Sequence, residues 1–204
     1  NPDGENELSS LDSDEIVEVK SNFFSFCREN LFWLKDYAAF MSIKNFYDEK
    51  AQKLREETKQ DVNGSWTSFW PEKLARHDQN EVEKWINSHT EEFLQTEAIQ
   101  FFAFTQWKEL HEYAKSKNVE IIGDIPIFVS PDSSDVWANQ NLFQIDGNGE
   151  FENVAGVPPD YFSATGQLWG NPLYDWQKMK TSNYEWWILR IKKSLELFDW
   201  LRID

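Results

Sequence analysis

Several residue types that other classes of protein depend on are scarce in this sequence. Cys27 is the only cysteine among 204 residues, so an internal disulfide is impossible and a reducing, cytoplasmic setting is expected. Histidine occurs three times, and no His, Cys and acidic residues gather at metal-ligand spacing, which disfavours a metal centre. No apolar run reaches the ~18 residues of a membrane helix, and the N-terminus has no apolar signal core.

Positive charge is also scarce. The chain has 20 Lys and Arg residues against 36 Asp and Glu residues, for a net charge of −16. Nucleic acids and anionic membranes bind clustered cations, so neither is an expected partner. Tryptophan, by contrast, is abundant, with 11 residues. Aromatic rings pack in cores and also stack on the C–H faces of sugars; we assign most of these rings to the core and about three to a ligand.

The hydrophobic pattern divides the chain into two parts. Helical periodicity runs through residues 13–30, 31–50 and 80–117, so residues 1–118 are interpreted as a mostly helical subdomain with a polar start over residues 1–12. At residue 119 the pattern changes to a β-rich run typical of a buried parallel strand. A helical pattern over 184–197 leads to a second β-rich run at 198–204. Strand, helix and strand predict a crossover between parallel strands, so residues 119–204 are interpreted as part of an α/β catalytic domain.

Both predicted strands end in a carboxylate. Alternate side chains of a strand point to opposite faces, so Arg202 and Asp204 share one face. A guanidinium beside a carboxylate favours the ionised form of the acid. Asp124 ends the other strand, and the carboxyl ends of parallel strands in an α/β barrel carry the catalytic groups. The pattern predicts an active site in which Asp204 is the nucleophile.

An aromatic segment rich in glycine and proline, residues 156–174, lies between the two strands. It carries four aromatic rings and three hydrogen-bonding side chains: Tyr161, Phe162, Trp169, Tyr174, Asp160, Gln167 and Asn171. Glycoside chemistry needs this mixture, because rings stack on sugars, polar groups bind hydroxyls and carboxylates react. Acids at strand ends also bind metals, and a metal site is the weaker alternative because the ligand cluster is missing.

Three long motifs then occur in order: IIGDIPIFVSPDSSDVWANQNLFQIDG (121–147), GVPPDYFSATGQLWGNPLYDW (156–176) and ELFDWLRID (196–204). They resemble the 4-α-glucanotransferases, also called amylomaltases or disproportionating enzymes, of glycoside hydrolase family 77. Two helical motifs, FWLKDYAAFMSIK (32–44) and FFAFTQWKEL (101–110), are similar to the inserted helices of that family. The resemblance covers about residues 28–204.

The resemblance implies a fold and a set of roles. The fold is α/β: a fragment of a (β/α)8 TIM barrel, its third and fourth strands, with a large helical insertion. Asp204 matches the nucleophile, Arg202 the arginine beside it and Asp124 an active-site aspartate. Trp169 and Asn171 match substrate contacts, and Tyr161 and Phe162 the loop over the glucan. Four further residues match the loop near the donor sugars: Asp132, Ser133, Asp135 and Trp137.

The implied function is transfer of α-1,4-glucan segments between maltooligosaccharides or starch-like and glycogen-like glucans, by a retaining double displacement without metal or organic cofactor. The partners implied are glucan donors and glucose or maltooligosaccharide acceptors, with no obligate protein partner. The family's acid/base glutamate comes later than Asp204, so we expect a fragment that is inactive by itself. Two alternatives stay open: a related α-glucan hydrolase, and a non-catalytic glucan-binding protein.

Overall fold

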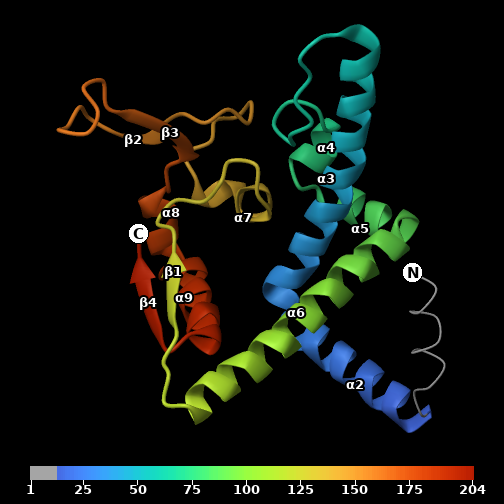
Figure 1. Cartoon of the computed structure of the whole chain (residues 1–204). Coiled ribbons are helices and arrows are strands. Elements are labelled where there is room, and N and C mark those ends of the chain that lie inside the picture. Colours follow the sequence, from blue (N-terminus) through green and yellow to red (C-terminus); the bar gives the residue numbers. More distant parts are fainter. Residues whose placement is uncertain (1–12) are drawn as a thin grey trace.

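The chain forms a helical part and a smaller β-containing part (Figure 1). The structure, a computed structural model, describes residues 13–204, and the polar start expected over residues 1–12 lies outside the described residues. The helical part comprises α2 (Ser13–Glu29), α3 (Leu31–Thr58), α4 (Glu72–Ala75), α5 (Gln79–Ser88) and α6 (Thr90–Ser116). The β-containing part comprises β1 (Ile122–Ile125), α7 (Ser134–Ala138), η1 (Gln140–Leu142), β2 (Val154–Val157), β3 (Gln167–Pro172), α8 (Trp176–Thr181), α9 (Glu185–Leu197) and β4 (Trp200–Ile203).

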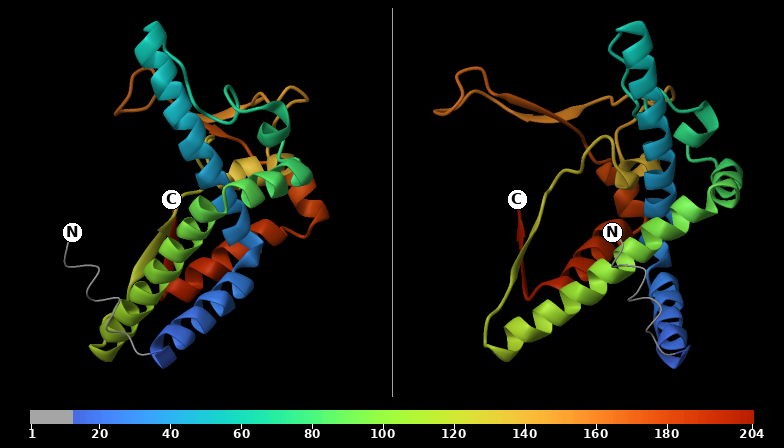
Figure 2. Two further views of the ribbon diagram at one scale, coloured as in Figure 1. Left: turned by 90° about the vertical axis from the view of Figure 1, so that its right-hand side faces the viewer. Right: turned by 45° about the vertical axis from the view of Figure 1, so that its right-hand side comes forward.

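Aromatic side chains join the long helices. α6 crosses α3, as the two views of Figure 2 show, and also contacts α2. Phe26 of α2 meets Phe104 of α6 with ring centroids 5.4 Å apart, and Trp33 of α3 stacks on the same Phe104 ring at 5.6 Å. These rings recur at helical spacing, which is why the periodic pattern predicted the helices. The predicted stretch 80–117 is two helices, α5 and α6, and the carboxylate of Asp78 caps α5.

Helix α3 continues past residue 50, where the sequence pattern was expected to end it, to Thr58. Residues 51–58 contain neither glycine nor proline and are mostly strong helix formers. Ala51 is fully buried, and Gln52 donates to Glu56 one turn further along. The helix ends where Lys59 adopts a left-handed conformation and its N–H binds the carbonyl of Arg55.

The main core lies between α3, the loop before α4 and the segment around α7, and it is built from indoles. Trp66, Trp70 and Trp137 are buried, and each indole N–H donates to a backbone carbonyl at 2.7 to 3.0 Å. A buried indole needs such an acceptor, so each ring is fixed in orientation as well as packed. The assignment of tryptophans to the core holds for these three.

Two small sheets form within residues 13–204. Strands β1 and β4 pair in parallel, with Asp124 opposite Arg202, and the crossover between them ends in α9. The predicted parallel pairing is therefore confirmed. Strands β2 and β3 form an antiparallel hairpin that projects from the body (Figure 1). The described residues do not close a barrel, so only a mixed α/β arrangement with a parallel pair is established by the chain itself.

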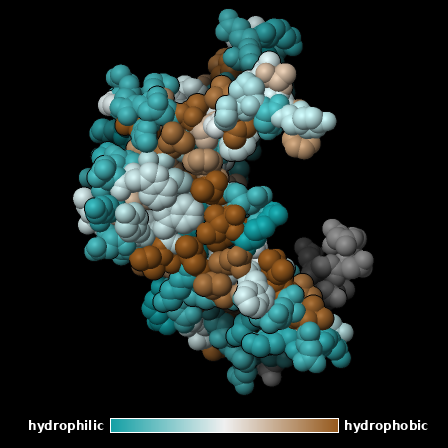
Figure 3. Space-filling view, turned by 90° about the vertical axis from the view of Figure 1, so that its left-hand side faces the viewer, coloured by the Kyte–Doolittle hydropathy of each residue, from teal (hydrophilic) through white to brown (hydrophobic). Residues whose placement is uncertain are grey.

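The helical period of α9 predicts an inner face made of Trp187, Ile188, Ile191 and Leu195. Trp187 packs against the core, together with Trp186, whereas Ile188 and Leu195 are 57% and 51% exposed. Viewed from the side of β4, apolar surface runs in a band between hydrophilic ends (Figure 3). None of the helices in the described range is both long and apolar enough to cross a bilayer.

Candidate active site

The carboxylates predicted at the two strand ends lie together. Because β1 and β4 are parallel and in register, Arg202 faces Asp124 across the pair. Its Nε donates to Asp124 Oδ1 at 2.9 Å and its Nη2 to Oδ2 at 2.6 Å, a bidentate pair. The same Nη2 reaches Asp204 Oδ2 at 3.1 Å. One guanidinium therefore bridges the two acids, and it binds Asp124 more closely than the Asp204 beside it in sequence.

The backbone also holds the two acids together. The N–H of Asp204 donates to the carbonyl of Ile125 at 3.0 Å, and the N–H of Ile127 donates to the carbonyl of Asp204 at 2.5 Å. The parallel ladder thus extends one residue beyond β4, which keeps Asp204 in strand geometry with its side chain on the Arg202 face.

Electrostatics favours the ionised form of Asp124. The hydrogen bonds from Arg202 hold the pKa of the Asp124 carboxyl below its usual range, and the positive charge adds to that effect. The pKa of Arg202 is raised in turn by the same hydrogen bonds. All three side chains are more than half exposed, so the charged edge is open to a ligand. An accessible carboxylate beside a guanidinium suits nucleophilic attack on an electrophilic carbon.

The hairpin of β2 and β3 carries the predicted aromatic segment. At its tip the carboxylate of Asp160 accepts the N–H groups of Phe162 and Ser163 at 2.9 and 2.7 Å, so Asp160 builds the turn. Gly166 has φ +74, and a Cβ there would lie 2.4 Å from the carbonyl oxygen of Val157. The Tyr161 and Phe162 rings are 97% and 91% exposed and stand edge to face, so their surfaces are free to cover a ligand.

The polar residues of β3 are engaged by protein groups. Trp169 is half exposed and its indole N–H donates to the side-chain oxygen of Gln167 at 3.1 Å. Asn171 donates through Nδ2 to the carbonyl of Val129 at 2.8 Å, which ties the hairpin to the loop after β1. The exposed face of the Trp169 ring remains available for stacking on a sugar.

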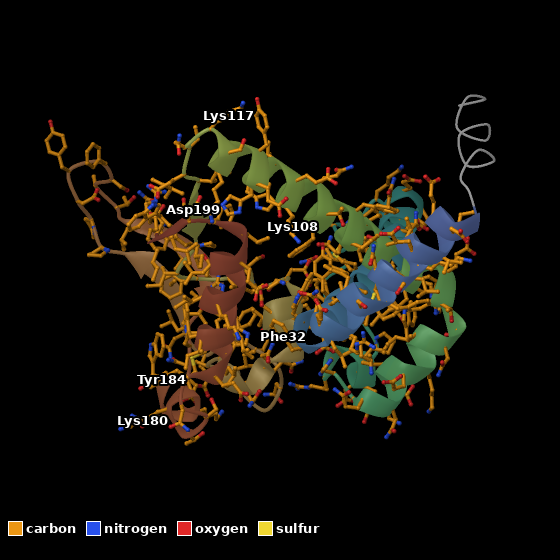
Figure 4. The ribbon with its side chains drawn as sticks, turned by 90° about the horizontal axis from the view of Figure 1, so that it is seen from below. Phe32, Lys108, Lys117, Lys180, Tyr184 and Asp199 are labelled. Atoms are coloured by element: carbon orange, nitrogen blue, oxygen red, sulfur yellow. The ribbon has the colours of Figure 1, made fainter. Side chains whose placement is uncertain are left out.

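Three of the residues predicted near the donor sugars lie apart from the charged cluster at the strand ends. Asp132, Ser133 and Asp135 line a cavity of about 750 Å³ between α3, α7 and α9, beside Phe32 in Figure 4. Among the described residues, this lining includes none of the three charged groups at the strand ends. The Asp132 carboxylate pairs with Lys44 at 2.5 Å. Burial raises the pKa of Asp135.

Trp137 requires a correction. It was predicted to lie near the donor sugars, but its side chain is fully buried and its indole N–H donates to the carbonyl of Leu74 at 2.7 Å. It lies edge-on to Trp70 and His77 and is tilted against Phe40. Because no part of the ring reaches the surface, Trp137 packs the core and its ring is not accessible to a ligand.

Two further residues lie next to the site. Tyr174, predicted to offer aromatic surface to a ligand, is instead 1% exposed, and its hydroxyl donates to the carbonyl of Ile127 at 2.8 Å. Arg190, which sequence reasoning missed as a site residue, donates through Nη2 to the carbonyl of Pro126 at 3.0 Å. A signal existed for Arg190, because Trp186 and Trp187 precede it by four and three positions, the spacing at which a helix brings a cation over an aromatic ring.

Across residues 13–204, no group of three or more His, Cys, Asp or Glu side chains is arranged to hold a metal ion. His111 of α6 and Asp199, the residue before β4, form a hydrogen bond of 2.9 Å. The carboxylate of Asp199, which is labelled in Figure 4, also accepts the N–H of Ile121. That pair joins α6 to the sheet.

Comparison with known proteins decides the family. The sequence model of glycoside hydrolase family 77, described as 4-alpha-glucanotransferase, matches residues 8–204. The chain belongs to this family. The predicted resemblance to the 4-alpha-glucanotransferases is confirmed.

Individual family members are similar over most of the chain. The 4-alpha-glucanotransferase of Streptococcus pneumoniae is 40% identical over 191 residues, which cover 93% of this chain and 35% of that protein. The 4-alpha-glucanotransferase of Clostridium butyricum is 42% identical over 187 residues, 90% of this chain and 35% of that protein.

A solved relative shares the fold. The amylomaltase from Streptococcus agalactiae in complex with acarbose aligns with a TM-score of 0.79 and 34% identity, over 95% of this chain and 35% of that one. The chain therefore spans about 35% of the length of the relatives that it matches.

Proposed function

We propose that a protein containing this chain is a 4-α-glucanotransferase that moves α-1,4-glucan segments to glucose or maltooligosaccharide acceptors. The observation that carries the proposal is the Asp124–Arg202–Asp204 cluster at the carboxyl ends of a parallel strand pair, in a chain of this family. The acarbose complex of the S. agalactiae relative supports an oligosaccharide ligand for a protein that contains this chain.

In the proposed reaction, an oxygen of Asp204 attacks C1 of a bound glucose unit while the bond from C1 to the glycosidic oxygen breaks. The leaving oxygen takes a proton from a second carboxyl group. Asp124 is a poor source of that proton, because Arg202 favours its ionised form. We therefore propose that the Asp124 carboxylate accepts hydrogen bonds from sugar hydroxyls. The role of general acid belongs to a carboxyl group outside the cluster. An acceptor hydroxyl then attacks C1, loses its proton to the acid's conjugate base and releases Asp204.

The proposal extends to the fold and the loop over the site. We propose that β1 and β4 are the third and fourth strands of a (β/α)8 barrel, with residues 1–118 a helical insertion and residues 156–174 the active-site loop. The exposed rings of Tyr161 and Phe162 favour a lid that excludes water and orients the acceptor, as transfer requires. Trp169 supplies the stacking surface, and Gln167 orients its indole.

The test is Asp204→Asn in a polypeptide of the relatives' full length that carries this sequence. Transfer from maltotriose should fall by about 1,000-fold or more, because the amide is not a nucleophile, while glucan binding measured by calorimetry persists. Asp61→Asn is a matched control, since this aspartate is exposed in the loop after α3, outside the proposed site. Full turnover by the Asp204→Asn variant would remove Asp204 from its role.

The same assay separates the alternatives. An unmodified protein that releases glucose from maltotriose without longer products is a hydrolase, and one that binds glucan without turnover is a binding protein. The cytoplasmic location stays a prediction, since a relative from Solanum tuberosum, 41% identical over 174 residues, carries the description chloroplastic/amyloplastic.

A further inference from the structure

The loop that follows β1 is held by side chains from α9, from β3 and from the segment between β3 and α8. Arg190 of α9 donates to the carbonyl of Pro126, Tyr174 to that of Ile127 and Asn171 of β3 to that of Val129, at 3.0, 2.8 and 2.8 Å. Each donor is far from its acceptor in sequence, by 64, 47 and 42 positions. Successive carbonyls of one loop are thus fixed from different directions.

This loop is directly connected to both acids of the cluster. It begins two residues after Asp124, and the N–H of Ile127 donates to the backbone carbonyl of Asp204. A shift of the loop therefore changes the separation of Asp124 and Asp204. Reaction rates depend steeply on such placement, and a displacement of about 1 Å costs about 100-fold.

Arg190 and Tyr174 are themselves tightly enclosed. The guanidinium of Arg190 lies 5.3 and 5.0 Å from the ring centroids of Trp186 and Trp187. Tyr174 is 1% exposed, and its ring contacts those of Phe143, Trp186 and Trp187. Burial raises the pKa of Tyr174 to about 12, so its hydroxyl remains a hydrogen-bond donor at neutral pH. Rigid surroundings suit residues that position others.

We propose that Arg190 and Tyr174 are positioning residues, which hold the loop of residues 126–129 and through it fix the separation of Asp124 and Asp204. The inference rests on the proposed function. Neither side chain touches the reacting atoms: both act on backbone carbonyls behind the charged edge. Their loss should slow the formation of the covalent intermediate more than it weakens glucan binding.

The experiment compares Tyr174→Phe, Arg190→Met and Arg190→Lys in the polypeptide of full family length. Tyr174→Phe keeps the ring and removes only the hydrogen bond. We expect its kcat for maltotriose transfer to fall about 10-fold or more, with KM within about 2-fold and the melting temperature nearly unchanged. Arg190→Lys should retain more of kcat than Arg190→Met, because an ammonium still donates to the Pro126 carbonyl.

Tyr47→Phe is the matched control. Tyr47 is a half-buried tyrosine of α3, and its hydroxyl makes no hydrogen bond within residues 13–204, so kcat should not change. An unchanged kcat in Tyr174→Phe and Arg190→Met, or a loss of kcat that tracks the melting temperature in all variants, would overturn the inference. An unmodified protein without transfer activity would instead remove the proposed function, and this inference with it.

Discussion

Arg202 is shared unequally between two acids. It forms two hydrogen bonds with Asp124 and one longer bond with Asp204. The acid that interacts with it most is therefore the one across the strand pair. This division suits the proposed chemistry, because Asp124 stays charged while an oxygen of Asp204 remains free to attack.

The unequal sharing has a measurable consequence. In Arg202→Gln the hydrogen bonds and the charge that lower the pKa of Asp124 are lost, so this pKa should rise toward the ordinary carboxyl value. A lowered folded-state pKa favours the folded state above the unfolded pKa, and this contribution is lost as the pH falls through the folded value. The difference in stability between the two proteins should therefore be present at neutral pH and disappear as the pH falls through the lowered pKa of Asp124.

Carbon-13 NMR titration of the Asp124 carboxyl measures this shift directly. Arg28→Gln removes an exposed arginine of α2 whose side chain, within residues 13–204, hydrogen-bonds to Ser25 alone, and it should leave the titration midpoint unchanged. An Arg202→Gln variant with the same midpoint as the unmodified protein would mean that Arg202 does not control the charge of Asp124.

At the residue scale, sequence reasoning succeeded where the signal is local. Alternation along a strand placed Arg202 and Asp204 on one face without tertiary information. The closer bond from Arg202 to Asp124 depends on the register between strands that are far apart in sequence, which no local pattern contains. The burial of Trp137 was unpredictable for the same reason, because it depends on α3 and α4 packing over it.

At the scale of an element, β1 is packed tightly at one point. Gly123 faces the ring of Phe198, and a Cβ built there would lie 2.1 Å from a ring carbon. Gly123→Ala should therefore destabilise the protein by about 1–3 kcal/mol through overpacking. Chemical denaturation checks this, with the midpoint falling at an unchanged slope.

Gly147→Ala is the control for that substitution, because nothing lies within 4 Å of a Cβ at that position. Adding Phe198→Leu to Gly123→Ala should recover part of the loss, since the smaller side chain makes room for the methyl group. Equal stability of the two alanine variants would show that the Phe198 ring moves aside without cost.

The helices were predictable as elements and less so in their packing. Helical periodicity predicted α2, α3 and α6 as elements, but Phe102 and Leu110 of α6, expected on its inner side, are 54% and 52% exposed. The end of α3 lacked a stop signal and lay eight residues beyond its predicted position.

In α9, the period placed Trp187 correctly but not Ile188 and Leu195, because apolar residues occur on more than one face of the helix. Trp186 packs against the core beside Trp187.

At the scale of the whole molecule, the described residues leave both sheets with unpaired edges. Each sheet has two strands, and exposed apolar side chains flank the β1–β4 pair at Ile122, Trp200 and Ile203, which are 70%, 58% and 56% exposed. Unpaired edges and exposed apolar patches promote association. The barrel itself was predicted only through the family resemblance, because two strands do not specify a closed sheet.

A polypeptide limited to residues 1–204 should therefore self-associate and bind the dye ANS. Sedimentation velocity and ANS fluorescence provide the measurement, with a polypeptide of the relatives' full length as the comparison. A monomer that does not increase the fluorescence of ANS would show that these edges and patches are compatible with a stable, separate unit.

The parallel pairing of β1 with β4 also affects the order of events during folding. Arg202 and Asp124 are 78 positions apart, whereas the contacts within each helix span three or four. Long loops cost little extra in equilibrium stability but slow the search for the native pairing. We expect the helices to gain protection first in pulsed hydrogen exchange and the charged cluster last, so that the nascent chain acquires its reactive edge only when the strands meet.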